Sequence, residues 1–362
     1  MVKINNISLK NFRNFINCQI NFNSNCNILF GDNGSGKTNI LESISLLSKG
    51  RGFRNASILD LVNKEEQNFF ISSEIEKDNI KYNVDAYNIV RNGNHKKVAS
   101  LNNEVSNDTK NFLDHSLSFL LFLPEMERLF LSSPSSRRNF IDKLIFTENK
   151  MYNSIVNKYK KKILERSKVL QNPNYDNNWI NVLEREISEV GLTIFNLRNE
   201  QINLLNQNLM LISNNSNYPF KVELKIKDSF FEDKLDLDKY LDCLVKSRQS
   251  DIRFGGCAIG PHKSDITAKI DKSTDASQLS TGQQKTLILM MIIAQCNYLV
   301  NIKDIKPIIL FDEICSHLDQ INRKILLELT NEYEVQFFLT GTEKSLFSFM
   351  STNSMFYNIT EL

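Results

Sequence analysis

The sequence predicts an α/β fold with a mixed or mostly parallel sheet at its core, a small antiparallel β region, and an inserted helical lobe that carries a short coiled-coil-like arm. Three observations predict this fold. An apolar strand at residues 27–30 runs through a glycine-rich loop directly into a helix pattern. Strand and helix patterns alternate after Gly282, which is typical of a parallel sheet covered by helices. The middle of the chain repeats apolar residues at helix period over long stretches.

The N-terminal region is predicted to consist mainly of strands. Short, partly alternating apolar runs occupy residues 2–9 and 18–22, ahead of the strand at 27–30. Between residues 69 and 105 further strand-like runs are separated by turn signals such as Lys77-Asp78-Asn79 and Asn102-Asn103. We therefore expect a small antiparallel sheet in this region.

The middle of the chain is predicted to be helical. Helix-period apolar positions cover residues 135–146, 151–170 and 179–211. Because Pro173 cannot continue a helix, the last two helices are expected to fold back on each other as an arm. At about 1.5 Å per residue the second of them would be on the order of 50 Å long.

The C-terminal part alternates between helix and strand patterns. A helix is expected from Gly282 to about residue 302, a strand at 307–311, a helix after Asp319 and a strand at 336–340. A largely apolar run at 117–123, which ends at Pro124, suits a buried strand.

Composition bounds the class of protein. A chain of 362 residues with 41% hydrophobic and 24% charged residues is expected to form one large or two joined globular domains. No apolar run reaches the roughly 18 residues that cross a bilayer, and the N-terminus lacks a basic stretch followed by an apolar one, so a cytoplasmic location without a membrane segment is expected. The six Cys residues form neither Cys-x-x-Cys nor Cys/His pairs, which indicates neither a zinc site nor a disulfide scaffold.

The segment from Gly31 to Thr38 has the pattern Gly-x-x-x-x-Gly-Lys-Thr between a strand and a helix expected at 39–47. Such a loop curls its backbone N–H groups around phosphate oxygens, and the helix adds its positive N-terminal end. Lys37 is expected to reach the β- and γ-phosphates and Thr38 to bind Mg²⁺. The pattern predicts a nucleoside triphosphate site. Its expected contact residues are Gly31, Asp32, Asn33, Gly34, Ser35, Gly36, Lys37, Thr38 and Asn39.

A second acidic motif follows the strand at 308–311. Asp312 and Glu313 come directly after it, and ligands lie at the carboxyl ends of parallel strands. We expect Asp312 to hold Mg²⁺ and Glu313 to orient or deprotonate the attacking water. Apolar strands that end in acidic residues are common, but the phosphate loop in the same chain favours a catalytic role.

The residues from Gln278 to Lys285 precede a long apolar helix, where a helix N-terminus can receive an anion. Leu-Ser-Thr-Gly-Gln, with Thr281 at its third place, resembles the signature motif of ATP-binding-cassette (ABC) ATPases, usually Leu-Ser-Gly-Gly-Gln. The resemblance implies that Ser280, Gly282 and Gln283 of one molecule cap ATP held by the phosphate loop of another, in a head-to-tail homodimer. Ser280 and Gln283 are the expected catalytic residues of this motif.

Two further segments resemble parts of the same superfamily. Ser316-His317-Leu318-Asp319 resembles its D-loop, which implies that Asp319 lies at the nucleotide and communicates across the dimer. Where many members have a switch histidine, this chain has Thr340-Gly341-Thr342, so either Thr340 or Thr342 is a candidate for that position.

The motifs divide the chain into three expected parts. Residues 1–115 would form the first ATP-binding lobe with the phosphate loop, residues 116–299 a helical lobe with the arm and the signature motif, and residues 300–362 the return to the ATPase core.

Several stretches in this order resemble the bacterial RecF family, over almost the whole chain. Two differences stand out: the family usually has Gly-Pro-His-Arg-Asp-Asp where this chain has Lys263 and Ser264 in place of the Arg and the first Asp, and it often has Asp-Asp where this chain has Asp312-Glu313. The stretches are Leu9 to Phe15, Gly52-Phe53-Arg54, Leu123-Pro124-Glu125, Ser133 to Asp142, Gly260 to Asp265, and Gly282 to Lys285.

The resemblance implies a DNA-binding, Mg-dependent ATPase of recombinational repair and replication, with weak, DNA-stimulated hydrolysis. It implies ATP-dependent dimerisation, binding to duplex and single-stranded DNA near gaps, and partnership with RecR and RecO in recombinase loading.

The net charge of +2 means that DNA binding would depend on local basic clusters. For some of the cations other roles stay open: the lysine run at 160–162 could be a solvated helix face, Arg137 and Arg138 could pair with carboxylates in the core, and Arg54 could act on the nucleotide. The candidates are Arg51, Arg54, Arg91, Lys96, Lys97, Arg137, Arg138, Lys160, Lys161 and Lys162.

Three other classes share some of these motifs. A transporter ATPase subunit has every ATP motif, but here roughly 240 residues separate Lys37 from Ser280. An SMC-like or Rad50-like head would carry much longer rods than this arm. A scaffold that does not hydrolyse ATP would not need Lys37, Asp312 and Glu313 intact.

Overall fold

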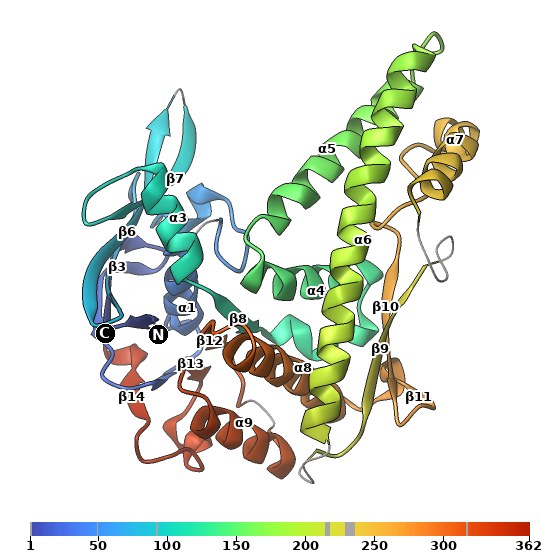
Figure 1. The fold of residues 1–362 in the computed structure, drawn as a ribbon. Helices are drawn as coiled ribbons and strands as arrows, with labels where there is room; N and C mark the ends of the chain where they lie inside the picture. Colours follow the sequence, from blue (N-terminus) through green and yellow to red (C-terminus); the bar gives the residue numbers. More distant parts are fainter. Residues whose placement is uncertain (1, 49, 92, 214–217, 229–235, 316–317) are drawn as a thin grey trace. The chain divides into compact units, whose positions relative to one another are not determined.

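The computed structural model describes residues 2–48, 50–91, 93–213, 218–228, 236–315 and 318–362, which form two compact units (Figure 1). Unit 1 consists of residues 1–127 and 281–362, and unit 2 of residues 128–280. These limits differ from the expected boundaries at 115/116 and 299/300. Strand β8 (Phe119–Phe122) pairs with β12 (Ile308–Phe311), and helix α8 (Thr281–Asn301) packs against β8, so both elements belong to unit 1.

Unit 1 contains an antiparallel sheet with the strand order β3-β2-β5-β6-β7 among the described residues, and β1 pairs with β5. Alternation places Leu9, Ile71 and Ala86 side by side on its buried face. Asp78 and Asn79, both with positive φ, form the tight β5–β6 turn, which confirms that turn signal. The strands are β1 (Val2–Ile4), β2 (Asn6–Phe12), β3 (Phe15–Asn21), β5 (Phe70–Lys77), β6 (Ile80–Arg91) and β7 (Asn94–Leu101).

The second sheet of unit 1 has the order β14-β4-β13-β12-β8 within the described residues, and every neighbouring pair is parallel. Every residue of β12 and β13 is buried, which explains their continuous apolar sequences. The buried Gln336 side chain joins the two sheets, because its amide accepts from the Ile4 N–H and donates to the Ile4 carbonyl. The strands not yet given are β4 (Cys26–Phe30), β13 (Gln336–Gly341) and β14 (Met355–Asn358).

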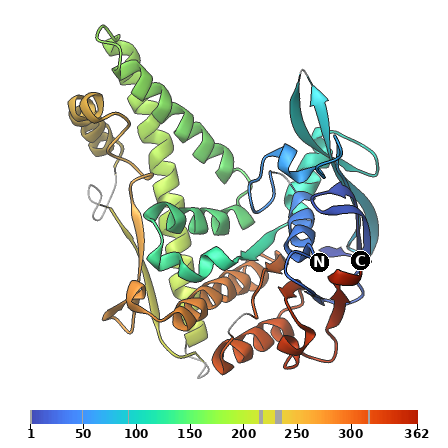
Figure 2. The same ribbon diagram turned by 180° about the vertical axis from the view of Figure 1, so that it is seen from behind.

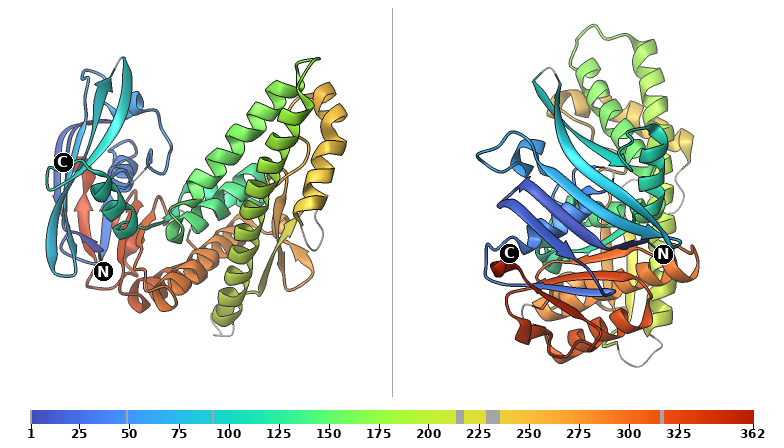
Figure 3. Two further views of the ribbon diagram at one scale, coloured as in Figure 1. Left: turned by 45° about the horizontal axis from the view of Figure 1, so that its top comes forward. Right: turned by 90° about the vertical axis from the view of Figure 1, so that its left-hand side faces the viewer.

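Helices α1 (Lys37–Leu46) and α9 (Gln320–Glu332) pack in the same unit, α1 against β13 and α9 against α8. The views in Figures 2 and 3 show the two sheets of unit 1 as successive layers. The sequence analysis assigned no element to the short segments that complete unit 1. These are α2 (Ile58–Leu61), α3 (Asn107–Ser116), η3 (Lys344–Phe347) and η4 (Ile359–Glu361), with η1 (Pro124–Leu131) running across the unit boundary.

Unit 2 is the helical lobe. Helices α5 (Tyr152–Leu170) and α6 (Asn177–Ser213) lie side by side as the predicted arm, joined by the turn that contains Pro173 (Figure 1). With 37 residues, α6 is about 55 Å long. Helix α7 (Leu237–Phe254), which the sequence analysis did not identify, packs against both. The rest of the unit is α4 (Pro134–Glu148), β9 (Val222–Lys227), β10 (Asp265–Ile270), β11 (Thr274–Asp275) and η2 (Ala276–Gln278).

A buried ionic cluster holds the arm helices to α7. The guanidinium of Arg166, which is fully buried, donates 2.9 Å to Glu184 of α6 and 2.6 Å to Asp251 of α7. Arg248 also binds Glu184. Because each charge in the cluster has hydrogen-bonded partners of opposite sign, its burial is tolerated.

The predicted fold class is therefore confirmed: an α/β ATPase-type head with a parallel core sheet, an antiparallel β region and a helical lobe with a short arm. Among the described residues, no helix is both long enough and apolar enough to span a membrane.

Candidate ATP-binding site

The phosphate loop follows β4 and ends at the first residue of α1. Its three glycines, Gly31, Gly34 and Gly36, all have positive φ. A Cβ at Gly36 would lie 2.5 Å from the ring of Phe15, and one at Gly31 would lie 2.5 Å from Thr360 Oγ1. Gly31 and Gly36 are therefore required both by backbone conformation and by close packing, as the sequence pattern predicts.

Lys37 turns back over this loop. Its Nζ donates hydrogen bonds of 2.7 Å to the carbonyl oxygens of Gly31 and of Asp32. Burial lowers the pKa of Lys37, while the nearby carboxylates of Glu313, Asp312 and Asp32 act in the opposite direction. The ammonium is thus held at the centre of the loop by neutral carbonyls, where an anionic phosphate would be a stronger partner.

Asp312 is the point at which three segments distant in sequence meet. Its Oδ1 accepts hydrogen bonds from Thr38 Oγ1 at 2.9 Å and from Thr340 Oγ1 at 2.8 Å. Burial raises the pKa of Asp312, and these two hydrogen bonds counteract that rise. The expected metal ligands Thr38 and Asp312 therefore lie next to each other at the carboxyl end of the parallel sheet.

Glu313 is exposed and has φ of 50°, an uncommon conformation for a residue other than glycine. Its N–H donates 2.7 Å to Thr340 Oγ1, so the same hydroxyl orients both acidic residues. Thr340 is fully buried, whereas Thr342 is exposed. Of the two switch candidates, Thr340 is the one in contact with the acidic pair.

The polar groups of the loop are suited to binding a polyphosphate. Ser35 Oγ is buried and, among the described residues, has no hydrogen-bond partner. An orphaned hydroxyl beside the start of α1 matches a phosphate oxygen, and a Cβ at Gly34 would meet no atom within 4 Å, so the loop is open at that glycine. Thr38 and Asp312 supply the hydroxyl and carboxylate oxygens that Mg²⁺ prefers.

Several residues around the loop were not identified from the sequence. Asn14 donates to the Ser35 carbonyl and accepts from Asn39, which in turn accepts from Arg54. The Thr360 hydroxyl accepts from the Asp32 N–H at 2.9 Å. Asn14 lies in the stretch 9–15 quoted for the family resemblance, so that stretch was a usable signal. Thr360 had none, because only the fold brings η4 to this loop.

Arg54 and Arg13 share one buried carboxylate. Glu42 of α1 accepts from Arg13 at 2.9 and 3.0 Å and lies 3.5 Å from Arg54. Arg54 also donates a hydrogen bond to Asn39, one of the expected nucleotide-contact residues. This contact favours a role for Arg54 at the nucleotide over a role in binding DNA.

The signature motif begins α8. A Cβ added at Gly282 would lie 3.7 Å from Asp319 Oδ2. The Gly282 carbonyl accepts hydrogen bonds from the side chains of Thr286 and Asn322. Asp319 caps α9 by accepting from the Asn322 N–H at 2.8 Å. The motif and the D-loop aspartate are therefore neighbours. Ser280 and Gln283 are exposed, and Ser316 and His317 of the predicted D-loop lie outside the described residues.

Besides Arg54, four of the ten candidate DNA contacts have structural partners. Lys97 donates to the carbonyls of Leu46 and Ser48 at the end of α1, and burial lowers its pKa to about 8. Lys162 pairs with Glu186 at 2.7 Å. Each ammonium already has a partner within its unit, which counts against a role as a DNA contact.

Arg137 and Arg138 are the other two of these candidates. Arg137 makes a bidentate pair with Asp265, at 2.7 and 2.8 Å, and Arg138 donates to the Ser264 carbonyl. The alternative that they serve the core is the one the structure supports. Exposed cations remain among the candidates, namely Arg51, Arg54, Arg91, Lys96, Lys160 and Lys161.

The Gly260 to Asp265 stretch forms one hydrogen-bonded corner of unit 2. His262 Nδ1 lies 2.8 Å from Tyr159 Oη, and Tyr159 lies 3.0 Å from Tyr240 Oη. Burial lowers the pKa of His262. Ser264, one of the two departures from the family pattern, is buried and donates to the Pro261 carbonyl, whereas Lys263 is exposed.

A phosphate loop and an acidic strand end on a parallel sheet, with an added antiparallel sheet and a helical insertion, define an ATPase head of the ABC/SMC type. The family model described as RecF/RecN/SMC N terminal domain matches residues 3–361, and the chain belongs to this family. Within it the similarity is to RecF, as the sequence resemblance predicted.

Curated relatives described as "DNA replication and repair protein RecF" include those of Rickettsia prowazekii (strain Madrid E) and Rickettsia akari (strain Hartford). They are 30% identical over 347 residues and 31% identical over 346 residues, each alignment covering 94% of both chains. Two solved structures, described as the recombination mediator protein RecF with ATPrS and with ATP in the RecFOR pathway, match with TM-scores of 0.84 and 0.82 at 25% and 26% identity. They cover 99% and 95% of this chain, and 97% and 93% of theirs. An Smc head bound to a domain of ScpA, with a TM-score of 0.55 at 17% identity, shares the fold.

Proposed function

We propose that this protein is an ATP-dependent DNA-binding protein of recombinational repair and replication. ATP binding would join two copies into a clamp on DNA near single-strand gaps, and hydrolysis would release it. The observation that carries the proposal is the meeting of Thr38, Asp312 and Thr340 at one oxygen atom, beside a phosphate loop with an orphaned hydroxyl. Relatives described as DNA replication and repair proteins support the choice of DNA as the partner.

The roles of the residues follow from their positions. The backbone N–H groups between Gly31 and Asn39 and the N-terminus of α1 would receive the phosphates, with Lys37 moving from two carbonyls to phosphate oxygens. Thr38 and Asp312 would hold Mg²⁺, which neutralises charge on the β- and γ-phosphates when bound. Glu313, fixed through its N–H by Thr340, would orient or deprotonate the attacking water.

The signature motif would complete the site of a second molecule. Ser280 directly precedes α8, and Gly282 and Gln283 lie in its first turn, where backbone N–H groups can receive an anion. Asp319 next to Gly282 would place the D-loop at the same interface. A site divided between two copies explains why ATP would control association.

The central test is dimerisation. Light scattering should show a dimer for the Glu313→Gln variant with ATP and Mg²⁺, and a monomer for Glu313→Gln without nucleotide. A second variant, Ser280→Arg combined with Glu313→Gln, should bind ATP and stay monomeric because its signature cannot approach the partner's phosphate. If Glu313→Gln stays monomeric at saturating ATP, the clamp is refuted.

The DNA part of the proposal has its own test. Gapped, duplex and single-stranded DNA should be bound in the presence of ATP, with gapped DNA bound most tightly, and the affinity should fall as salt rises because phosphate contacts release counterions. Replacing Lys160 and Lys161 together with Gln should lower the slope of log affinity against log salt by about 1 for each lost phosphate contact. Arg91 and Lys96, at the ends of β6 and β7, form the second pair to replace.

RecO and RecR are the proposed protein partners, because the solved relatives are described as members of the RecFOR pathway. Size-exclusion chromatography of the Glu313→Gln dimer on gapped DNA, with and without purified RecR and RecO, should show a larger complex. Weak hydrolysis, stimulated by DNA, is expected of the same clamp. A rate that does not change with gapped DNA would remove that part of the proposal.

A further inference from the structure

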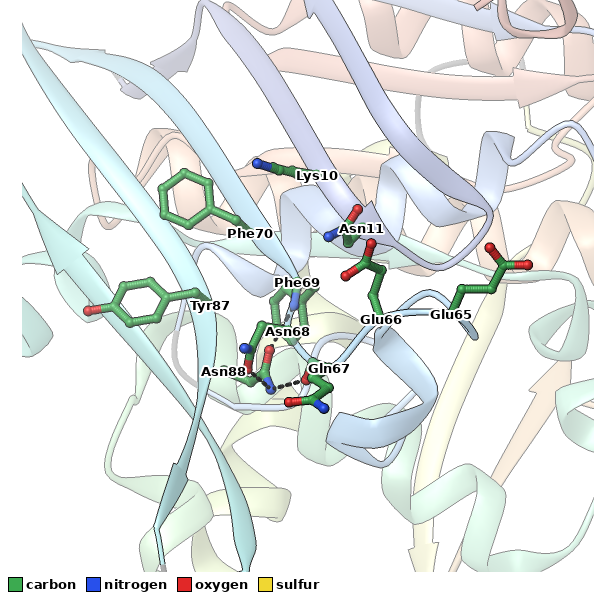
Figure 4. Close-up of a pocket in the computed structure, with 10 residues that line it drawn as sticks. All are labelled: Lys10, Asn11, Glu65, Glu66, Gln67, Asn68, Phe69, Phe70, Tyr87 and Asn88. Atoms are coloured by element: carbon green, nitrogen blue, oxygen red, sulfur yellow. Dashed lines mark hydrogen bonds between the residues drawn. The ribbon is translucent and has the colours of Figure 1, made fainter.

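A pocket of about 690 Å³ opens on unit 1, outside the ATP site (Figure 4). It lies where β2, β5 and β6 of the antiparallel sheet meet the segment that leads into β5. Its volume is within the range of known ligand sites. The lining residues are Lys10, Asn11, Glu65, Glu66, Gln67, Asn68, Phe69, Phe70, Tyr87 and Asn88.

One side of the pocket is aromatic. Phe70 and Tyr87 are directly opposite each other on β5 and β6, with ring centroids 6.0 Å apart and planes inclined by 25°. Phe70 is 42% exposed, although its neighbours on either side in the chain, Phe69 and Ile71, are buried. The two rings are stacked with nearly parallel planes, and the exposed part of Phe70 is apolar surface that costs free energy to leave in water.

The opposite side is acidic. Figure 4 shows Glu65 and Glu66 across the pocket from the two rings, with Lys10 and Asn11 at the rim between them. Among the described residues, neither the two carboxylates nor the Lys10 ammonium has a hydrogen bond or an ion pair. The charges that line the pocket are therefore available to a ligand, and together they are negative.

The floor is built and rigid. Asn88 is 4% exposed, accepts from the Phe69 N–H at 2.8 Å, and donates to the Gln67 carbonyl and to Asn68 Oδ1 at 3.1 Å. A buried amide with its hydrogen bonds satisfied fixes the segment that carries Glu65 and Glu66 against the strand that carries Tyr87. The two sides are held apart at a set spacing, which lowers the entropic cost of binding.

We propose that this pocket binds an arginine side chain of a partner protein. A guanidinium is the one protein side chain that can stack on the exposed ring of Phe70 beside Tyr87 and at the same time donate paired hydrogen bonds to a carboxylate such as Glu66. A lysine ammonium makes no such paired contact. Lys10 at the rim repels a second positive charge, so a single arginine beside neutral or acidic residues fits better than a polybasic segment.

DNA fits the same pocket less well. Aromatic rings on a sheet face can stack nucleobases, but sites of this kind combine the rings with positive charge that follows the phosphates. Here two carboxylates face the rings and only Lys10 opposes them, so a phosphate would meet net repulsion. The inference is separate from the ATP site and from the clamp, and does not depend on either.

The test uses the full-length protein labelled with 3-fluorotyrosine. The ten Tyr signals are followed by ¹⁹F NMR, and the Tyr87 signal is assigned as the one lost in Tyr87→Phe. The probes are acetyl-Ala-Arg-Ala-amide, its Lys and Ala counterparts, and the oligonucleotide dT10. The Arg probe should shift the Tyr87 signal saturably with weak affinity, on the order of millimolar, and at least about threefold more tightly than the Lys probe.

The variant Glu65→Gln/Glu66→Gln should weaken Arg binding about tenfold and leave the spectrum of the other tyrosines unchanged. Both side chains are exposed and without partners, so this variant tests the pocket without risk to folding. Phe70→Leu, which keeps an apolar side chain but removes the ring, should have a similar effect. Equal binding of the Ala and Arg probes, or tighter binding of dT10 than of the Arg probe, would overturn the proposal. In every case dimerisation by ATP should stay as in the parent protein, which separates this result from the test of the clamp.

Discussion

The ATP site of unit 1 and the polar corner of unit 2 are both built from motif residues, yet they handle polar groups in opposite ways. In the ATP site Ser35 Oγ has no partner among the described residues, and Lys37 binds only neutral carbonyl oxygens. In unit 2 Arg137 and Arg198 each have a carboxylate at hydrogen-bond distance on two atoms. In the ATP site, hydrogen-bonding groups are left available to bind a ligand. In unit 2, the hydrogen-bonding groups are bound to one another within the protein.

This difference separates chemistry from architecture among motifs that look alike in sequence. An incompletely satisfied polar site costs stability and is kept where a ligand completes it. A fully satisfied buried network keeps charged groups inside a core and fixes which elements touch. Motif residues in unit 2 should therefore control folding, and those of the phosphate loop should control turnover.

The largest effect is expected for Asp142→Asn in α4. Asp142 accepts from Arg198 at 2.8 and 2.9 Å and from Tyr152 at 2.6 Å, and the Arg198 side chain is only 6% exposed. Because the neutral amide leaves a buried guanidinium without its counter-charge, the free energy of unfolding should fall by about 3–5 kcal/mol.

Urea unfolding followed by the fluorescence of Trp179, the only tryptophan of the chain, reports on this change, because Trp179 lies in α6 of unit 2. The exposed Asp242 of α7 provides the control, and Asp242→Asn should change stability by less than about 0.5 kcal/mol. Equal, small effects of the two substitutions would contradict the architectural role of the corner.

The second effect concerns turnover and should leave folding nearly intact. Lys37→Ala removes the ammonium expected on the phosphates, so the rate of ATP hydrolysis should fall by about 10²–10³-fold, as for the loss of one preorganised donor. Phosphate release measures the rate, and urea unfolding checks the fold. Lys64→Ala, at an exposed site in the same unit, should hydrolyse ATP at the parent rate. A Lys37→Ala protein with full activity would remove the phosphate loop from the mechanism.

The sequence predicts the residues of the ATP site better than the ion pairs of unit 2. The phosphate loop and the acidic strand end are local patterns, and the structure brings their expected metal ligands Thr38 and Asp312 to hydrogen-bond distance. The pairing of Arg137 with Asp265 joins residues 128 positions apart, and no local pattern distinguishes such a core arginine from a DNA-binding one. The same holds for Thr360, which reaches the phosphate loop only because β14 pairs with β4.

Helix α7 shows a different limit. Its buried positions, Tyr240, Leu244, Ser247 and Asp251, include a hydroxyl and a carboxylate, so its inward face does not stand out as an apolar stripe. Two of these polar residues, Ser247 and Asp251, accept hydrogen bonds from Arg166, which lies between the helices. A pattern that depends on a buried ion cluster is not visible until the cluster is known.

The third prediction tests whether Lys97, a candidate DNA contact that donates to the carbonyls of Leu46 and Ser48, behaves as part of the core. Burial lowers its pKa to about 8 in the folded protein, below the unfolded value of about 10.5. The unfolded chain therefore binds more protons between these two values, and stability should rise as pH increases from about 8 towards 10.5, and be lost again as pH falls through about 8.

Lys97→Met removes this titration and serves as the reference, because every other group stays the same. The free energy of unfolding of the parent protein should rise by about 1–2 kcal/mol relative to Lys97→Met between pH 7 and 9.5, measured by urea unfolding with circular dichroism. A difference between the two proteins that does not change with pH would mean that the Lys97 ammonium is solvated.

The smallest effect is expected at Thr340, which positions both acidic residues of the ATP site. Thr340→Val removes the hydrogen bond to Asp312 Oδ1 and the acceptor for the Glu313 N–H, while it keeps the shape of the side chain. The loss of about 1 kcal/mol of orienting interaction corresponds to a fall in kcat of about fivefold. Thr340→Ser, which retains the hydroxyl, should recover most of the rate.

The pH profile distinguishes positioning from simple loss of stability. The Thr340 hydroxyl lowers the pKa of Asp312 against the rise caused by burial, so its removal should shift the acid limb of kcat to higher pH. A fall in kcat at every pH without that shift would assign Thr340 to packing alone. With the shift, the Thr340 hydroxyl would set the charge state of Asp312, one of the two residues expected to hold Mg²⁺.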